Sequence, residues 1–345
     1  MGGSTFGRVF QIHSFGESHG KAMGVVIDGC PSGVKFSLTQ LQEFVNRRRP
    51  GFSPFSSKRK EADQVELLSG VYEGYTLGTP IALLVYNQDA RSSDYDEIKK
   101  KPRPGHADDV WKVKYKHTDH RGGGRASARE TLSRVMAGAV AKMLIQSLQP
   151  KLNVFSFIKS IGLFEISSAA TQAIMQHPSP KKELEKLDLA IPDKECLEKV
   201  KKLLGDAGVS GESYGGVVQL VVRGLPAGLG QPVFHKLKAD LALALLSIGS
   251  TVGLEFGDGF KISSERGSEF HSLQQQHNYA GLRGGISTGE AMVVKIAFKP
   301  VSSVGAVARN GRHDPCVLQR ALPIVESMVL LSIADHLLSC RLDKV

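Results

Sequence analysis

The chain has 345 residues, a formal net charge of +10 at pH 7 and an isoelectric point near 9.4. Its 41% of apolar residues is enough for a sizeable core, and the excess of basic residues favours acidic partners such as nucleic acid, anionic membranes or small anions. Aromatic residues make up 7% and do not alternate with the basic clusters, which argues against a nucleic-acid partner.

The cysteines and the N-terminus indicate an intracellular setting. Cys30, Cys196, Cys316 and Cys340 form no C-x-x-C pair, which argues against a zinc site or a disulfide scaffold and suits a reducing cytosol. No basic segment followed by an apolar run opens the chain, and no apolar run approaches the length of a membrane span. We therefore expect a cytoplasmic protein with no membrane partner.

In the first half of the chain, hydrophobic spacing predicts mostly strands. Strands are expected at residues 9–12 and 24–27 around a glycine turn, and again at 65–71 and 81–86. A short helix is expected at 39–49, ended by Pro50 and Gly51. Residues 87–122 are long, charged and poor in apolar side chains, which is typical of functional segments.

The second half mixes helices with apolar strands. Ser127 and Glu130 fit an S-x-x-E capping box before an amphipathic helix at 128–148. We also expect strands at 154–164, 217–222 and 293–298, variable helical structure at 165–212, and helices at 237–246 and 317–342. Repeats, heptads and linkers are absent, so the sequence predicts a single α+β domain over residues 1–345.

The most informative segment is a glycine run that enters the helix at 128–148. Gly122, Gly123 and Gly124 stand directly before its N-terminus, where free N–H groups and the positive dipole end attract anions. Three arginines, at 121, 125 and 129, add full charges where a phosphate or carboxylate would bind. The alternative interpretation is a well-capped core helix with solvated arginines.

Three titratable residues lie in other turns, each with a structural alternative. His19 lies in a glycine-bounded turn at 16–20 and His106 in an Arg-Pro-Gly-His turn, so either is a candidate for proton transfer or an ordinary loop histidine. Asp314 and Pro315 fit the start of a helix, where the aspartate would be a cap. His117, Asp119 and His120 lack supporting ligands, so no metal is expected.

Taken together, these segments resemble the chorismate synthase family. The resemblance follows the order of the whole chain and is carried by three long motifs, at 16–31, 122–131 and 312–326. Shorter matches lie at residues 47–51, 63–65, 103–108 and 284–289. The resemblance implies an α+β fold of the chorismate-synthase type, a β-α-β sandwich with antiparallel sheets and interleaved helices, assembled as a homotetramer.

The resemblance also implies an activity in aromatic amino-acid biosynthesis. The substrate would be 5-enolpyruvylshikimate 3-phosphate, and a 1,4-anti elimination of phosphate would give chorismate. Reduced FMN would be required as a transient electron donor, without net redox change. His106 would protonate the leaving phosphate, His19 would protonate or hydrogen-bond to the reduced flavin, and Asp314 would act with the flavin in removing the C6 proton.

The binding residues follow from the same resemblance. Because the substrate carries one phosphate and two carboxylates, an arginine-rich pocket is expected, formed by Arg48, Arg103 and Arg129. The residues implied to contact the flavin are Arg125, Ala126, Ser127, Gly249, Ser250, Gly284, Lys299, Pro300, Val301, Ser302, Ser303 and Arg312.

Two alternative functions stay open at this stage. The first is a bifunctional enzyme that also reduces FMN with NADPH, although no added nicotinamide module is visible and the reduced flavin is expected from an external source. The second is a basic nucleic-acid-binding protein, in which charge alone would matter and binding would fall steeply with salt.

Overall fold

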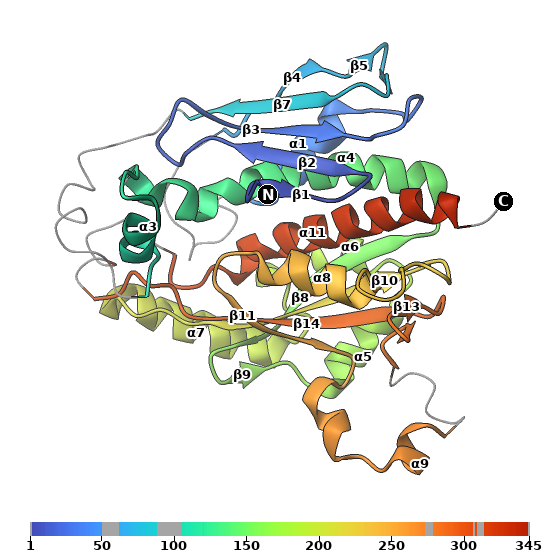
Figure 1. Cartoon of the computed structure of the whole chain (residues 1–345). Coiled ribbons are helices and arrows are strands. Elements are labelled where there is room, and N and C mark those ends of the chain that lie inside the picture. Colours follow the sequence, from blue (N-terminus) through green and yellow to red (C-terminus); the bar gives the residue numbers. More distant parts are fainter. Residues whose placement is uncertain are drawn as a thin grey trace.

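Two long helices, α4 (Thr131–Leu148) and α11 (Leu318–Ser339), pack against each other in the middle of the computed structural model, with a sheet on either side (Figure 1). The structure describes residues 2–49, 62–87, 105–119, 121–272, 279–305, 308 and 314–343. Both helices are apolar around most of their circumference, because both are covered by a sheet on one side and by each other on the other.

The first sheet belongs to the N-terminal part of the chain and is antiparallel throughout, in the order β1-β2-β3-β7-β4. Alternate residues of β3, such as Met23, Val25 and Ile27, are fully buried, and β3 lies against α4. The strands and the covering helix are β1 (Thr5–Phe6), β2 (Gln11–Phe15), β3 (Ala22–Asp28), β4 (Glu66–Ser69), β7 (Ile81–Tyr86) and α1 (Leu38–Asn46), with a small hairpin of β5 (Val71–Tyr72) and β6 (Tyr75–Thr76).

The second sheet is also antiparallel, in the order β11-β14-β10-β8-β9, and α11 packs on β8 and β10. Its strands are β8 (Asn153–Ile161), β9 (Phe164–Glu165), β10 (Gly216–Arg223), β11 (Thr251–Phe256) and β14 (Met292–Phe298). Figure 1 shows α5 and α7 on the side of this sheet away from α11. The remaining elements are α3 (Asp108–Tyr115), α5 (Ser168–Gln176), α6 (Pro180–Leu184), α7 (Lys194–Ser210), α8 (Leu237–Leu246), α9 (Gly267–Phe270), β12 (Leu282–Arg283) and β13 (Ile286–Ser287).

This architecture confirms the predicted α+β class with antiparallel sheets and interleaved helices. The predicted helix at 237–246 is α8, and the predicted buried helix at 317–342 contains α11. Part of the charged stretch at 87–122 is the helix α3, which has no buried residue and therefore left no hydrophobic period in the sequence.

Two sequence-based predictions about helices are wrong. The capping box does not form, because the Ser127 side chain accepts from the backbone N–H of Arg129 and the Glu130 carboxylate pairs with Arg134 instead of returning to the cap. The prediction that no apolar run approaches the length of a membrane span is wrong for α11. By length and composition alone, this helix is long and apolar enough to cross a membrane. The apolar part of α11 is buried inside the protein, as expected of a core helix.

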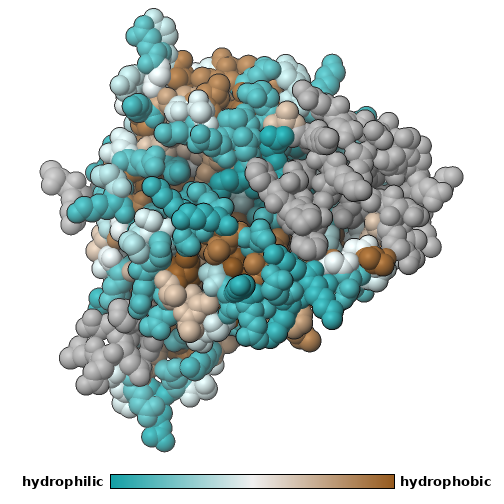
Figure 2. All heavy atoms as spheres, turned by 180° about the vertical axis from the view of Figure 1, so that it is seen from behind, coloured by the Kyte–Doolittle hydropathy of each residue, from teal (hydrophilic) through white to brown (hydrophobic). Residues whose placement is uncertain are grey.

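The outward surface of the first sheet and its small hairpin is apolar in places. Phe15, Leu68 and Tyr86 are about half exposed, at 45%, 60% and 53%, and Tyr72 and Tyr75 extend the same region. Figure 2 shows apolar side chains gathered at the end of the molecule where this sheet lies. Exposed apolar area of this kind is typical of surfaces that contact another chain.

The crossing of α4 and α11 generates the first prediction. A methyl group on Gly138 would lie 2.4 Å from Cβ and 2.5 Å from Oγ of Ser327, so the helices approach closely only because this residue is glycine. We expect Gly138→Ala to lower the free energy of unfolding by about 2 kcal/mol through overpacking, measured by urea denaturation.

The matched control is Gly205→Ala, which places the same methyl group in α7 with nothing within 4 Å. Alanine is the better helix former, so this variant should be equally or more stable than the wild type, by up to about 1 kcal/mol. Equal effects of the two substitutions would contradict the assigned crossing.

Candidate functional site

The glycine run supports the ring of His19. Gly122, Gly123 and Gly124 have φ angles of 59°, 80° and 53°, in the left-handed region that favours glycine. A Cβ on Gly122 would lie 2.1 Å from Nδ1 of His19, and the backbone N–H of Ser18 donates to the carbonyl of Gly124 at 3.3 Å. The loop is therefore shaped to fit the histidine turn, in which Ser18 and His19 are buried.

Two arginines of this segment are held by neighbouring protein groups. Arg121 pairs with Asp119 at 2.8 Å, and Arg125 donates to the Ser14 hydroxyl at 2.6 Å and to the carbonyl of Gly16 at 3.1 Å. Arg125 therefore fastens the glycine run to the end of β2, a structural role that the sequence did not predict. The alternative of solvated arginines is also wrong for Arg129, which is 8% exposed.

Arg129 and Arg48 meet at a buried carboxylate. Arg129 binds Asp63 at 2.6 Å, and NH1 of Arg48 lies 3.8 Å from the other oxygen of that carboxylate. Arg48 also donates to the Thr131 hydroxyl and to the carbonyl of Ala128, both at 2.8 Å. Two guanidinium groups thus share one carboxylate, and buried guanidinium groups held in fixed positions are a common means of binding anions.

Asn87 joins this cluster to the His19 turn. Its side-chain oxygen accepts from Nε and NH2 of Arg129 at 3.2 and 3.1 Å. Its amide nitrogen donates to the carbonyls of Glu17 and Gly20 at 3.2 and 2.9 Å. Sequence reasoning missed both Asn87 and Asp63 as site residues. Asp63 lies in one of the matching segments, whereas no local signal marks Asn87.

Asp314 is connected to the same cluster from the other side. Its carboxylate pairs with Arg320 at 2.6 Å, and Nε of Arg320 donates to the carbonyl of Arg48 at 3.3 Å. The helix α11 begins only at Leu318, so the interpretation of Asp314 as its cap is wrong. A series of contacts therefore connects the His19 turn to Asp314, through Asn87, the arginine pair on Asp63 and Arg320.

His106 lies at the start of α3, where its Nδ1 is 2.6 Å from a carboxylate oxygen of Asp108. The ammonium of Lys299 donates to the carbonyl of Gly105 at 2.6 Å, and the backbone N–H of Lys299 donates to Ser250 at 2.9 Å. The His106 turn thus contacts the segment 299–303, which in turn contacts Ser250, and both 249–250 and 299–303 are expected to bind flavin.

The segment 213–214 connects these loops to Asp314. The hydroxyl of Ser213 donates to the carbonyl of Val301 at 2.8 Å, and the backbone N–H of Tyr214 donates to the carbonyl of Pro315 at 2.9 Å. In Figure 1, α3 lies at the same end of the molecule as the first turns of α4 and α11. The structure therefore brings the predicted proton-transfer residues to one end of the fold.

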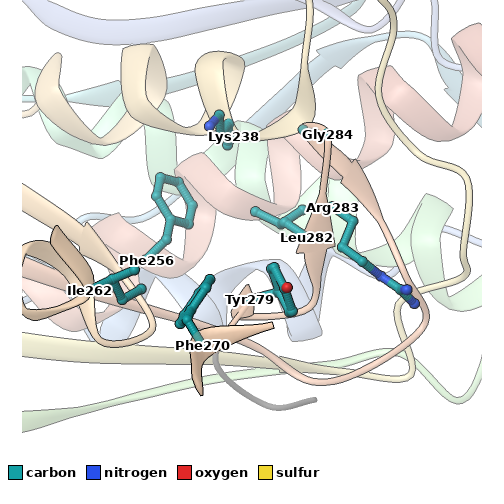
Figure 3. Close-up of a pocket in the computed structure, with 9 residues that line it drawn as sticks. Lys238, Phe256, Ile262, Phe270, Tyr279, Leu282, Arg283 and Gly284 are labelled. Carbon is teal, nitrogen blue, oxygen red and sulfur yellow. The ribbon is translucent and has the colours of Figure 1, made fainter. Parts of the chain in front are cut away.

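Gly284 is not at this end. The carbonyl of its neighbour Gly285 accepts from Leu237 at the start of α8, whereas Ser250 follows the end of that helix. Ten helical residues separate the two places by roughly 15 Å. Gly284 instead borders a pocket of about 450 Å³ with aromatic walls (Figure 3). Arg103 and Arg312, also predicted for the site, lie outside the described residues.

A second buried carboxylate fixes the end of α1 beside the site. Glu326 on α11 receives two hydrogen bonds from Arg47, at 2.6 and 2.9 Å, and one from Ser156 at 2.8 Å. Burial alone would raise the pKa of Glu326, but Arg47 and Lys181 outweigh it and lower the pKa to about 2. Glu326 is therefore ionised and provides a counter-charge to Arg47, while the neighbouring Arg48 lies beside Asp63.

Within the part of the chain described, no group of three His, Cys, Asp or Glu side chains is placed to hold a metal.

Buried arginines near histidine and aspartate side chains are a combination typical of enzyme sites. Comparison with known proteins agrees. A sequence model of the chorismate synthase family matches residues 10–338, and the chain belongs to that family of lyases.

Individual relatives extend over the full length. The chain is 48% identical to chorismate synthase of Bdellovibrio bacteriovorus, covering 100% of both chains. It is 43% identical to that of Methanosarcina barkeri, over 98% of this chain and 97% of the other. A crystal structure of chorismate synthase superposes with a TM-score of 0.78 at 29% identity, covering 96% of this chain and 93% of the other.

Gly122 generates a prediction about His19. We expect Gly122→Ala to displace the imidazole, because the new methyl group would overlap the ring, and therefore to shift the His19 ring signals in NMR spectra of the folded protein. Gly33→Ala is the control, since Gly33 also has a positive φ of 81° but a Cβ there would meet nothing within 4 Å. His19 signals that stay in place in Gly122→Ala would refute the contact.

Glu326 generates a prediction about stability and pH. Glu326→Gln leaves a buried arginine without its counter-charge, so we expect a loss of about 3 kcal/mol in the free energy of unfolding at pH 7. Because the folded pKa is lowered, the stabilisation is present above the unfolded pKa of about 4.3 and is lost as the pH falls towards 2.

Urea denaturation between pH 7 and pH 3 measures this difference. The wild type and Glu326→Gln should converge as the pH falls. Glu183→Gln, which removes a partly exposed carboxylate of α6 that pairs with Lys186, should change stability by less than about 0.5 kcal/mol throughout. A gap between wild type and Glu326→Gln that does not change with pH would contradict the assignment.

Proposed function

We propose that the protein eliminates phosphate from 5-enolpyruvylshikimate 3-phosphate in a 1,4-anti reaction to form chorismate, in the presence of reduced FMN. The observation that carries this proposal is the cluster of Arg48 and Arg129 on Asp63, held by direct contacts to both the His19 turn and the Arg320–Asp314 pair. Membership of the chorismate synthase family supports it over the full length of the chain.

The substrate fits the charge of this cluster. It carries a phosphate and two carboxylates, and buried guanidinium groups bind such anions strongly because little water competes. We infer that Arg48 and Arg129 attract the substrate, with Arg103 as a further contact. Asp63 offsets the repulsion between the two guanidinium groups and holds them in fixed positions before the substrate arrives.

Proton transfer falls to three residues. His106 would donate a proton from Nε2 to the departing phosphate, since Nδ1 is engaged with Asp108. Asp314, held by Arg320, would accept the proton that leaves the ring of the substrate. His19 would hydrogen-bond to the cofactor or protonate it, in the orientation fixed by Gly122.

The residues at the end of β14 fit a flavin mononucleotide. An ammonium, hydroxyls and backbone groups gather there at Lys299, Ser302 and Ser250, and a Cβ at Gly249 would meet nothing within 4 Å, so space is available. These residues, with 125–127, 300–303 and Arg312, would hold the cofactor. When bound, reduced FMN would supply electron density to the substrate transiently and recover it.

We further propose a cytoplasmic homotetramer that receives reduced flavin from an external source. The half-exposed apolar side chains on the first sheet support contact with other copies.

Phosphate release tests the reaction. The protein is mixed anaerobically with the substrate and chemically reduced FMN, and inorganic phosphate is followed over time. We expect release with reduced FMN and none with oxidised FMN plus NADPH. Absence of release in the first mixture would refute the lyase proposal, and release in the second would show a flavin reductase activity in addition.

His106→Ala tests the acid. We expect phosphate release to fall by about 100-fold or more, within the usual contribution of a general acid, while flavin binding measured by fluorescence stays close to that of the wild type. Near-normal release by this variant would remove His106 from the role. The control is His177→Ala. His177 directly follows α5, which lies on the side of the second sheet away from α11, so phosphate release by this variant should equal that of the wild type.

A further inference from the structure

The contact between His106 and Asp108 defines which ring nitrogen of the histidine carries hydrogen. The carboxylate oxygen lies 2.6 Å from Nδ1, and a carboxylate accepts hydrogen bonds, so Nδ1 is the donor. Nε2 is then the atom that gains and loses a proton. A carboxylate at this distance also favours the charged imidazolium over the neutral ring.

The pair is fixed in position by its surroundings. Asp108 is the first residue of α3, and the turn before it contains Gly105 with a φ of 71°. On the other side, Lys299 at the end of β14 holds this turn by its bond to the carbonyl of Gly105. The side chains of His106 and Asp108 are only 19% and 13% exposed, so solvent screens their interaction incompletely.

The charged groups near His106 have opposite effects on the stability of its imidazolium form. The ammonium of Lys299 disfavours the imidazolium, but it binds the carbonyl of the preceding residue, whereas Asp108 contacts the ring itself. The carboxylate of Asp109 turns to the backbone N–H of Val110 at 2.8 Å, so it does not share this contact. Among the described charged neighbours, Asp108 therefore has the strongest electrostatic effect on the His106 ring.

We propose that Asp108 is a positioning residue for the elimination: it fixes the ring of His106, keeps hydrogen on Nδ1 and maintains the imidazolium that donates its Nε2 proton to the leaving phosphate. This inference rests on the proposed function, in which His106 is the general acid. The negative charge of Asp108 stays on the carboxylate throughout, and the proton given to the phosphate comes from Nε2 alone.

The first test needs no turnover. In the full-length protein labelled with 15N-histidine, His106 is assigned by the signal lost in His106→Gln. We expect the neutral wild-type ring to carry hydrogen on Nδ1. In Asp108→Asn its titration midpoint should fall by about one pH unit or more, because the opposing charge is gone.

Asp109→Asn is the matched control. It removes the same charge from the same first turn of α3, so any general effect of the helix dipole or of net charge is equal in both variants. Its His106 signals should match those of the wild type. An unchanged midpoint in Asp108→Asn, or an equal shift in Asp109→Asn, would overturn the proposal.

The second test is the pH profile of phosphate release. Because the acid must be protonated, kcat falls as the pH rises through the titration of His106, and Asp108→Asn should show this fall at lower pH by the interval seen in the NMR titration. Near pH 8 we expect kcat to be about tenfold lower, with KM altered less than threefold. If the wild type releases no phosphate, the proposed function fails, while the NMR titration still decides whether Asp108 controls His106. A profile equal to that of Asp109→Asn would overturn the positioning role.

Discussion

A single buried carboxylate, Asp63, holds the site together. Two arginines from distant parts of the chain converge on it, one from the end of α1 and one from the turn before α4. Neither guanidinium would be stable in this buried position without a counter-charge, and Asp63 provides one to both. Asp63 thus fixes the two arginines that we propose to bind the anionic substrate.

The neighbouring residues Arg47 and Arg48 illustrate how the fold separates structural charge from functional charge. Arg47 is bidentate on Glu326, in the middle of α11, and this pair connects α1 to the core. Arg48 points the other way and shares Asp63. The two adjacent arginines thus bind different carboxylates, one on the core helix α11 and one beside the residues proposed for the site.

How much the sequence could predict depended on the range of the interactions. Helices with a long apolar period, such as α8 and the core of α11, were predicted well because their pattern is local. The partners of the arginines were not, since Arg129 lies 66 positions from Asp63 and 42 from Asn87. Nor did local rules place Arg125, whose partners Ser14 and Gly16 lie at the end of β2, or Asp314, which pairs with Arg320 and does not cap α11. The family resemblance supplied the candidate residues, and the contacts explain which of them are held together.

The proposed elimination involves no net redox change. Arginines bind the substrate, two histidines and an aspartate donate or accept protons, and the flavin returns to its starting state. The most direct measurement is therefore the stoichiometry of phosphate released to flavin oxidised, taken anaerobically by combining a phosphate assay with the absorbance of the flavin. The account predicts many phosphates per flavin, with the flavin still reduced when the substrate is exhausted. Oxidation of one flavin for each phosphate released would contradict it.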